Sequence, residues 1–152
     1  MEPTRNQIME ALLKLAASIA WTGVSGPGQF RETTRKWRDF SQFSQAETPA
    51  LIQMEPSEAV VSKLGLPNRR TFEVRWLVFF QTDPADPSDV GAVLMSDIID
   101  AVERALYSNE PDMRQTLGGL VAGVHLGPEI LKAAGDDTGE GIIAMSLSVV
   151  VP

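Results

Sequence analysis

The segment that decides the fold is TFEVRWLVFFQ, residues 71–81. Every second side chain from Phe72 to Phe80 is apolar, and alternate side chains of a strand lie on the same face. The opposite face begins polar and becomes apolar at Leu77 and Phe79. We therefore predict a strand that is covered on one face along its whole length and on both faces over its second half.

A helical pattern precedes this strand. Thr4 and Gln7 have the spacing of a capping box, in which each side chain satisfies a backbone N–H at the start of a helix. Apolar residues then recur at helical spacing from Ile8 to Ile19. The sequence predicts a first helix over residues 5–21, ended by the glycines that follow it.

A second helical pattern follows the strand. Asp86 suits an N-cap and Pro87 suits the first helical position, where no N–H is needed. Apolar residues recur at helical spacing from Val90 to Leu106. We predict a helix that starts at residue 87, ends at Tyr107 or Ser108, and exposes an acidic side.

The remaining apolar segments alternate as strands do. Residues 49–55 are expected to form a strand that ends at Pro56, with residues 57–68 as a connection. The later part of the chain predicts strands over residues 120–126, 129–133 and 142–151, with a bulge at Gly127-Pro128 and a hairpin tip over residues 134–141.

This order of elements differs from the alternation of a doubly wound parallel sheet. It predicts an α+β fold, with an antiparallel sheet of about four to five strands and two main helices packed on one face. The 152 residues are expected to form a single domain, since two separate cores would be cramped in a chain of this length.

Residues 29–48 are polar, with isolated aromatic side chains and a basic character. Aromatic residues between basic ones can stack on and bind nucleic acid, but two acidic residues, Glu32 and Asp39, weaken that pattern here. We expect an extended arm or loop whose aromatic side chains dock on the core. Its basic residues are Arg31, Arg35, Lys36 and Arg38.

Charge is distributed unevenly along the chain. The formal net charge is −7, of which residues 1–76 contribute +2 (ten Lys/Arg, eight Asp/Glu) and residues 77–152 contribute −9 (three Lys/Arg, twelve Asp/Glu). Tight binding to a nucleic-acid backbone needs clustered positive charge, so the net charge of −7 argues against a nucleic-acid-binding function. Two interpretations stay open: copies of the chain pack head to tail through oppositely charged halves, or the acidic half is a solvated surface.

Few residues in the chain suggest catalysis. There is no cysteine, which excludes disulfides, thiolate catalysis and cysteine-bound metals, and the one histidine, His125, is expected at a surface or interface. The acidic segment from Asp136 to Glu140 lacks the alternation of a calcium loop and is expected to be a solvated turn. Asp97 and Asp100 can share a helix face, but acidic helix faces are common. We expect no enzyme, no cofactor and no metal site.

The chain has no apolar run of about 18 residues, the length that predicts a transmembrane helix. Its first residues also lack the basic and then apolar pattern of a secretory signal. Synthesis in the cytoplasm is the expectation.

Three stretches together resemble a known family. The first joins RKWR (residues 35–38) to TPALIQME (48–55), and the second joins GLPNRR (65–70) to the aromatic strand and Asp83-Pro84. The third is QTLGGLV (115–121) with the acidic hairpin and the final strand. Their order and spacing, over most of the chain, resemble the tail terminator or minor tail (tail completion) proteins of long-tailed bacteriophages and gene-transfer particles.

The resemblance implies structural work in a virion. Such proteins form a hexameric ring at the head-proximal end of the tail tube, or neck. The ring ends tube polymerisation and joins the tail to the head-completion or connector (stopper) protein. Genomic DNA passes through its lumen without specific binding. The implied partners are thus further copies of the chain, the tube protein, the connector and DNA, with no membrane.

The resemblance and the charge pattern together suggest candidate surfaces. Subunit or partner contacts are expected at the basic segment (Arg31, Arg35, Lys36 and Arg38) and at the hairpin tip (Asp136, Asp137 and Glu140). Lumen candidates are the tip residues together with Asp97, Asp100 and Glu103 of the second helix. The alternative function is a small-ligand-binding or enzymatic α+β domain with a pocket between the second helix and the sheet. A nucleic-acid-binding module is a further alternative.

Overall fold

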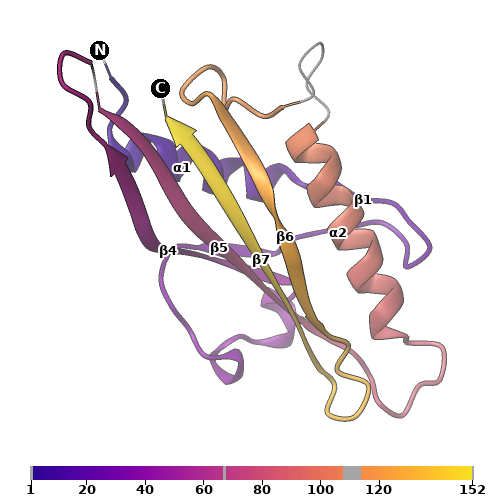
Figure 1. The fold of residues 1–152 in the computed structure, drawn as a ribbon. Helices are drawn as coiled ribbons and strands as arrows, with labels where there is room; N and C mark the ends of the chain where they lie inside the picture. Colours follow the sequence, from indigo (N-terminus) through magenta and orange to yellow (C-terminus); the bar gives the residue numbers. More distant parts are fainter. Residues whose placement is uncertain (1, 67, 108–113, 152) are drawn as a thin grey trace.

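The computed structural model describes residues 2–66, 68–107 and 114–151 (Figure 1). In the described part of the chain, the helices are α1 (Arg5–Ser18) and α2 (Gly91–Tyr107). A five-stranded sheet has the order β3-β4-β5-β7-β6, formed by β3 (Glu32–Thr34), β4 (Ala50–Val61), β5 (Arg69–Gln81), β7 (Glu140–Val151) and β6 (Gly123–Ala133). The smaller elements are β1 (Ala20–Trp21) paired with β2 (Gly28–Gln29), and two short 3₁₀ turns, η1 (Phe40–Gln42) and η2 (Gln45–Glu47).

The predicted α+β fold is confirmed, and the sheet is mostly antiparallel. Among the described strands the parallel pair is β3 with β4, which makes the sheet mixed. β3 lies inside the segment 29–48 that we expected to be an extended arm, and it pairs with the start of β4. The phenylalanines of this segment dock as predicted, since Phe30 joins the main core and Phe40 and Phe43 join a smaller one. Trp37 does not dock, because it is 54% exposed.

β5 occupies the centre of the sheet and carries the core. Its apolar side chains at alternate positions from Phe72 to Phe80 are at most 4% exposed and belong to one cluster with buried residues of both helices. On the opposite face, Phe79 lies against Phe40 and Phe43, with ring centroids 5.1 and 5.6 Å away. The prediction of one long apolar face and one half-covered face is confirmed.

A buried polar side chain links the sheet to α1. Gln53 of β4 is fully buried, accepts a hydrogen bond from the indole N–H of Trp76 at 3.0 Å, and donates one to the backbone carbonyl of Met9 at 3.0 Å. Both halves of its amide are therefore satisfied, which is the condition for keeping a polar group in a core.

Both predicted helices are shorter at one end than expected. α1 ends at Ser18 because Ile19 is extended and the next two residues pair with β2. α2 begins at Gly91, since the Asp86 carboxylate accepts from the backbone and hydroxyl of Ser88 in a turn before the helix. Asp86 and Pro87 are therefore not the N-cap and first residue of α2. The alternative end at Ser108 lies outside the described residues.

Two strand boundaries also differ from prediction. β4 does not end at Pro56 but continues to Val61, through a register shift between Met54 and Ser57. A bulge on a strand with an open edge accommodates a residue that has no N–H to donate. β6 begins at Gly123 and not at residue 120, because residues 117–119 have positive φ angles and form a turn.

The end of the chain agrees with the sequence more closely. The predicted bulge at Gly127-Pro128 is confirmed by a register shift between Leu126 and Ile130. The strand predicted over residues 142–151 is present, two residues longer, as β7. The hairpin tip over residues 134–141 joins β6 to β7, although its last two residues belong to the strand.

The Gln53 bridge yields a test by a double-mutant cycle. Gln53→Leu leaves the buried indole N–H of Trp76 without its acceptor, so the free energy of unfolding should fall by about 1–3 kcal/mol. Trp76→Phe leaves the Gln53 oxygen without its donor and should also destabilise. The double variant should lose less than the sum of the two, as measured by urea denaturation. Additive losses would show that the two side chains do not depend on each other.

Candidate functional site

Arg35 of the basic segment is used within the chain. Its guanidinium contacts Glu55 of β4 at 2.7 Å and Glu10 of α1 at 2.9 Å, and it donates to the Asn6 side chain at 3.2 Å. Hydrogen bonds to Glu55 and then Glu10 raise the pKa of the Arg35 guanidinium. Arg35 therefore ties the segment after β3 to both β4 and α1.

Arg38 holds the two 3₁₀ turns together. It pairs with Glu47 at 3.1 Å, donates to the Gln42 carbonyl at 2.6 Å, and lies 4.2 Å from the centroid of the Phe43 ring. Hydrogen bonds from Arg38, and secondarily from Ser44, lower the pKa of Glu47 to about 2. The charge of Arg38 is thus matched inside the chain.

The basic segment therefore divides into two pairs. Arg35 and Arg38 stabilise the fold, whereas Arg31 and Lys36 are exposed and make no ion pair within the described residues. Contact of the segment with another chain stays a prediction. Arg31 and Lys36 are the two basic residues that remain exposed for such a contact.

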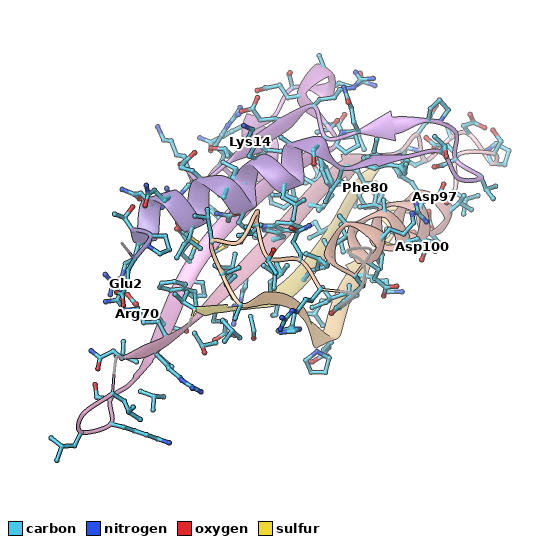
Figure 2. All side chains as sticks on the ribbon, turned by 90° about the horizontal axis from the view of Figure 1, so that it is seen from above. Glu2, Lys14, Arg70, Phe80, Asp97 and Asp100 are labelled. Carbon is cyan, nitrogen blue, oxygen red and sulfur yellow. The ribbon has the colours of Figure 1, made fainter. Side chains whose placement is uncertain are left out.

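The acidic residues of α2 also divide into one that is used within the chain and two that are exposed. Asp97 accepts hydrogen bonds from the backbone N–H of Ser25, at 2.8 Å, and from the Ser25 hydroxyl. These bonds lower the pKa of Asp97. Asp97 fixes the turn between β1 and β2 against the helix. Asp100, labelled in Figure 2, is exposed, and so is Glu103. Asp97 and Asp100 therefore differ in surroundings: Asp97 holds a turn within the chain, and Asp100 faces solvent.

The hairpin tip is fastened to the end of β5. Thr82 donates from its backbone to the Gly139 carbonyl at 2.8 Å and from its hydroxyl to the Gly135 carbonyl at 3.1 Å. Gly135 and Gly139 have φ angles of 74° and 83°, which favour glycine. The tip thus has a defined shape, and it carries three exposed acidic side chains: Asp136, Asp137 and Glu140.

A second acidic segment meets the tip. The loop from β5 to α2 lies at the same end of the sheet as the tip (Figure 1), and a surface hollow is lined by both. Its lining is Asp83, Asp86, Asp89 and Asp136, with Pro84, Pro87 and Val90. We call the loop and tip, residues 82–90 and 134–140, the acidic end. Sequence reasoning missed it because it treated the loop acids as signals for a helix start.

The opposite end of the sheet carries the hairpin between β4 and β5. Residues 57–66 and 68–70, here called the β4–β5 arm, extend past Arg70 away from the body (Figure 2). Its apolar side chains are exposed: Val60, Val61, Leu64 and Leu66. The sequence prediction missed this arm because Pro56 was expected to end the strand.

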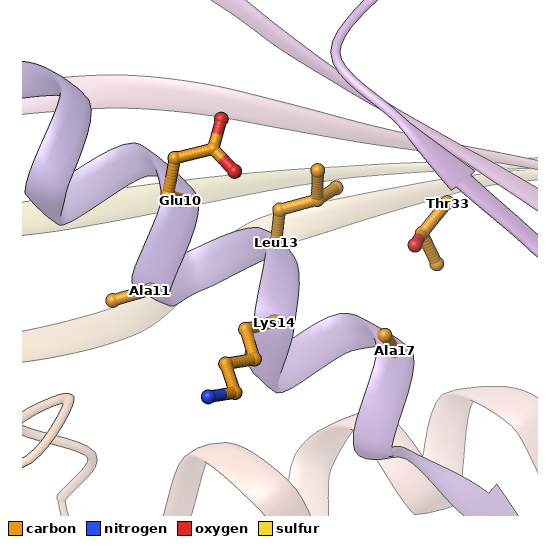
Figure 3. A pocket seen from close by; sticks show the side chains of 6 residues that line it. All are labelled: Glu10, Ala11, Leu13, Lys14, Ala17 and Thr33. Atoms are coloured by element: carbon orange, nitrogen blue, oxygen red, sulfur yellow. The ribbon is translucent and has the colours of Figure 1, made fainter.

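The alternative function needs a pocket between α2 and the sheet. The space between α2 and the sheet is filled by side chains such as Ile98, Val102 and Leu106, all fully buried. An open depression lies between α1 and β3 (Figure 3), lined by Glu10, Ala11, Leu13, Lys14, Ala17 and Thr33.

The described residues hold no group of three or more His, Asp or Glu side chains placed to bind a metal ion. They also hold no helix long and apolar enough to cross a membrane. His125 is exposed on β6.

Comparison with known proteins finds no protein family and no curated protein that matches this chain.

The Arg38–Glu47 pair makes stability depend on pH. The pKa of Glu47 falls from 4.5 to about 2 on folding, so the pair stabilises the fold above pH 4.5 and this stabilisation is lost as the pH falls towards 2. Glu47→Gln should flatten the loss of stability across that window, as followed by thermal unfolding. Asp100→Asn controls for the removal of one negative charge. An unchanged profile in Glu47→Gln would contradict the pairing.

Proposed function

We propose that this chain is a tail terminator of a long-tailed bacteriophage or related particle. Six copies form a ring on the head-proximal end of the tail tube, end tube polymerisation and join the tail to the connector. The protein is made in the host cytoplasm and resides in the neck of the virion. The observation that carries this proposal is the difference between the two ends of the sheet.

One end of the sheet is basic and apolar, and the other is acidic. The arm carries Lys63 and Arg69 beside its exposed apolar residues, whereas the acidic end carries the carboxylates of the loop and the tip. β5, whose 13 residues span about 40 Å, separates them. Identical subunits that close into a ring contact one another through two different surfaces, so a subunit with two complementary ends suits such a contact.

The remaining acidic surface suits a channel for DNA. Asp100 and Glu103 are exposed on α2 and make no ion pair within the described residues. Six copies carry a formal charge of 6 × −7 = −42, which repels phosphates. We assign these two residues to the lumen. Of the two roles considered for the hairpin tip, the lumen and a contact with another subunit or partner, we propose the contact.

The packing of the core supports structural work over the alternative of a ligand-binding or enzymatic domain. That alternative needs a pocket between α2 and the sheet, where the helix is tightly packed. The exposed features of the molecule are surfaces suited to macromolecules: an apolar arm, a charged end and a helix face.

The ring is tested by electron microscopy and by tail assembly. The purified protein, or the protein bound to tube ends, should form six-fold rings in negative stain, and particles that lack it should have tubes of uncontrolled length. A protein that stays monomeric at high concentration, together with tubes of normal length in its absence, would exclude the proposal.

The lumen assignment is tested by charge reversal. Asp100→Lys with Glu103→Lys should leave the fold and ring intact, because both side chains are exposed, and should slow DNA ejection by attracting phosphates. Ejection is measured as release of DNA from purified particles at two salt concentrations, and high salt should relieve the defect. Glu129→Lys, on exposed β6, is the control. Normal ejection from the double variant would exclude these residues from the lumen.

A further inference from the structure

The β4–β5 arm exposes more apolar surface than a solvated hairpin needs. Leu64 is fully exposed and Leu66 is 62% exposed, while Val60 and Val61 are 50% and 52% exposed. Successive strand residues point to opposite faces, so both faces of the arm are open at the two valines. Several exposed apolar side chains gathered on one hairpin favour a surface that another molecule covers.

The arm is also basic. The arm contains three cations, Lys63, Arg69 and Arg70, and one acidic residue, Glu58. Glu58 pairs with Arg5 of α1 at 2.8 Å, and this hydrogen bond, with a smaller contribution from Arg70, lowers the pKa of the Glu58 carboxyl. Lys63 and Arg69 are exposed and make no ion pair in the described part of the chain. The arm thus carries two exposed cations as well as its exposed apolar side chains.

The arm keeps a defined shape without a partner. Its strands pair from Ser57 with Glu73 to Val61 with Arg69, and the Ser62 hydroxyl donates to the Asn68 side-chain oxygen at 2.7 Å. A turn is closed by the bond from the Leu66 N–H to the Lys63 carbonyl at 3.0 Å. A preformed hairpin loses little conformational entropy on binding.

We propose that the arm of each subunit docks onto the acidic end of the neighbouring copy, and that this contact closes the ring. This inference rests on the proposed function and names its subunit interface. The occupant of the docking contact is a second copy because the acidic end matches the arm in both chemistries. Its carboxylates suit Lys63 and Arg69, and its proline and valine side chains suit the two leucines.

Each copy then has one arm and one receiving surface, at opposite ends of the sheet (Figure 1). Repetition of such a contact closes a ring when the rotation per subunit divides a full turn, and otherwise extends a filament. DNA is a poorer occupant of the arm, because a phosphate backbone offers nothing to the leucines and the chain as a whole is negatively charged.

The apolar part of the contact is tested with Leu64→Ser plus Leu66→Ser. This variant should keep the melting temperature of the parent protein, since both side chains are exposed, and should raise the concentration needed for half-maximal ring formation by roughly tenfold or more. Val24→Ser, on a different exposed loop, is the matched control and should assemble normally. Rings of unchanged stability from the leucine variant would overturn the inference.

The charged part is tested by a swap between copies. Lys63→Glu with Arg69→Glu, and separately Asp136→Lys with Asp137→Lys, should each weaken assembly while the subunits stay folded. An equal mixture of the two should restore rings, because an alternating ring of six has complementary charges at every interface. Mass measurement in solution and negative-stain images report the result. Failure of the mixture to assemble would exclude the contact between the arm of one copy and the acidic end of the next.

The remaining outcomes separate this inference from the proposed function. Six-fold rings from both charge variants alone would overturn the docking contact and leave the tail terminator function standing. Rings that keep their stability but lose binding to a duplex DNA probe would assign the arm to nucleic acid, which also overturns it. A parent protein that forms no ring in solution or on tube ends would remove both proposals together.

Discussion

β5 is hydrogen-bonded to β4 along one edge and to β7 along the other, and this double pairing sets the positions of the remaining elements. A strand paired on both edges and apolar on one whole face must be covered, and α1 and α2 supply that cover from the same side. The Gln53 amide, held between Trp76 and the Met9 carbonyl, fixes where α1 lies on the sheet. Within the described residues, no buried side-chain nitrogen or oxygen lacks a hydrogen-bond partner.

The length of β5 also explains why the two ends of the molecule differ. A strand of 13 residues places its neighbouring turns far apart, so charges near one end are not neutralised by charges near the other. The arm carries Lys63, Arg69 and four exposed apolar side chains at one end, and the loop and hairpin tip carry carboxylates at the other. Such a subunit suits the head-to-tail association that we propose.

Several charged residues that look alike in the sequence have different roles in the fold. Arg35 and Arg38 are matched by carboxylates that lie elsewhere in the chain, whereas Arg31 and Lys36, from the same short segment, are left at the surface. Asp97 anchors the turn between β1 and β2. The separation of anchoring charges from surface charges depends on long-range neighbours, so spacing along the chain does not reveal it.

The sequence by itself determined the α+β class, the central strand with its two differently covered faces, the two helices, and the bulge at Gly127-Pro128, because side-chain period and turn residues act locally. The sequence pattern predicted the wrong start for α2, because Asp86 caps a turn before the helix and not the helix itself. It also predicted the wrong end for β4, because pairing with β5 continues the strand past Pro56. Only the tertiary structure decided that the β5–α2 loop meets the hairpin tip, and that the β4–β5 arm extends from the body. Both depend on strand register and on how far each strand continues, which come from pairing between distant residues and not from local pattern.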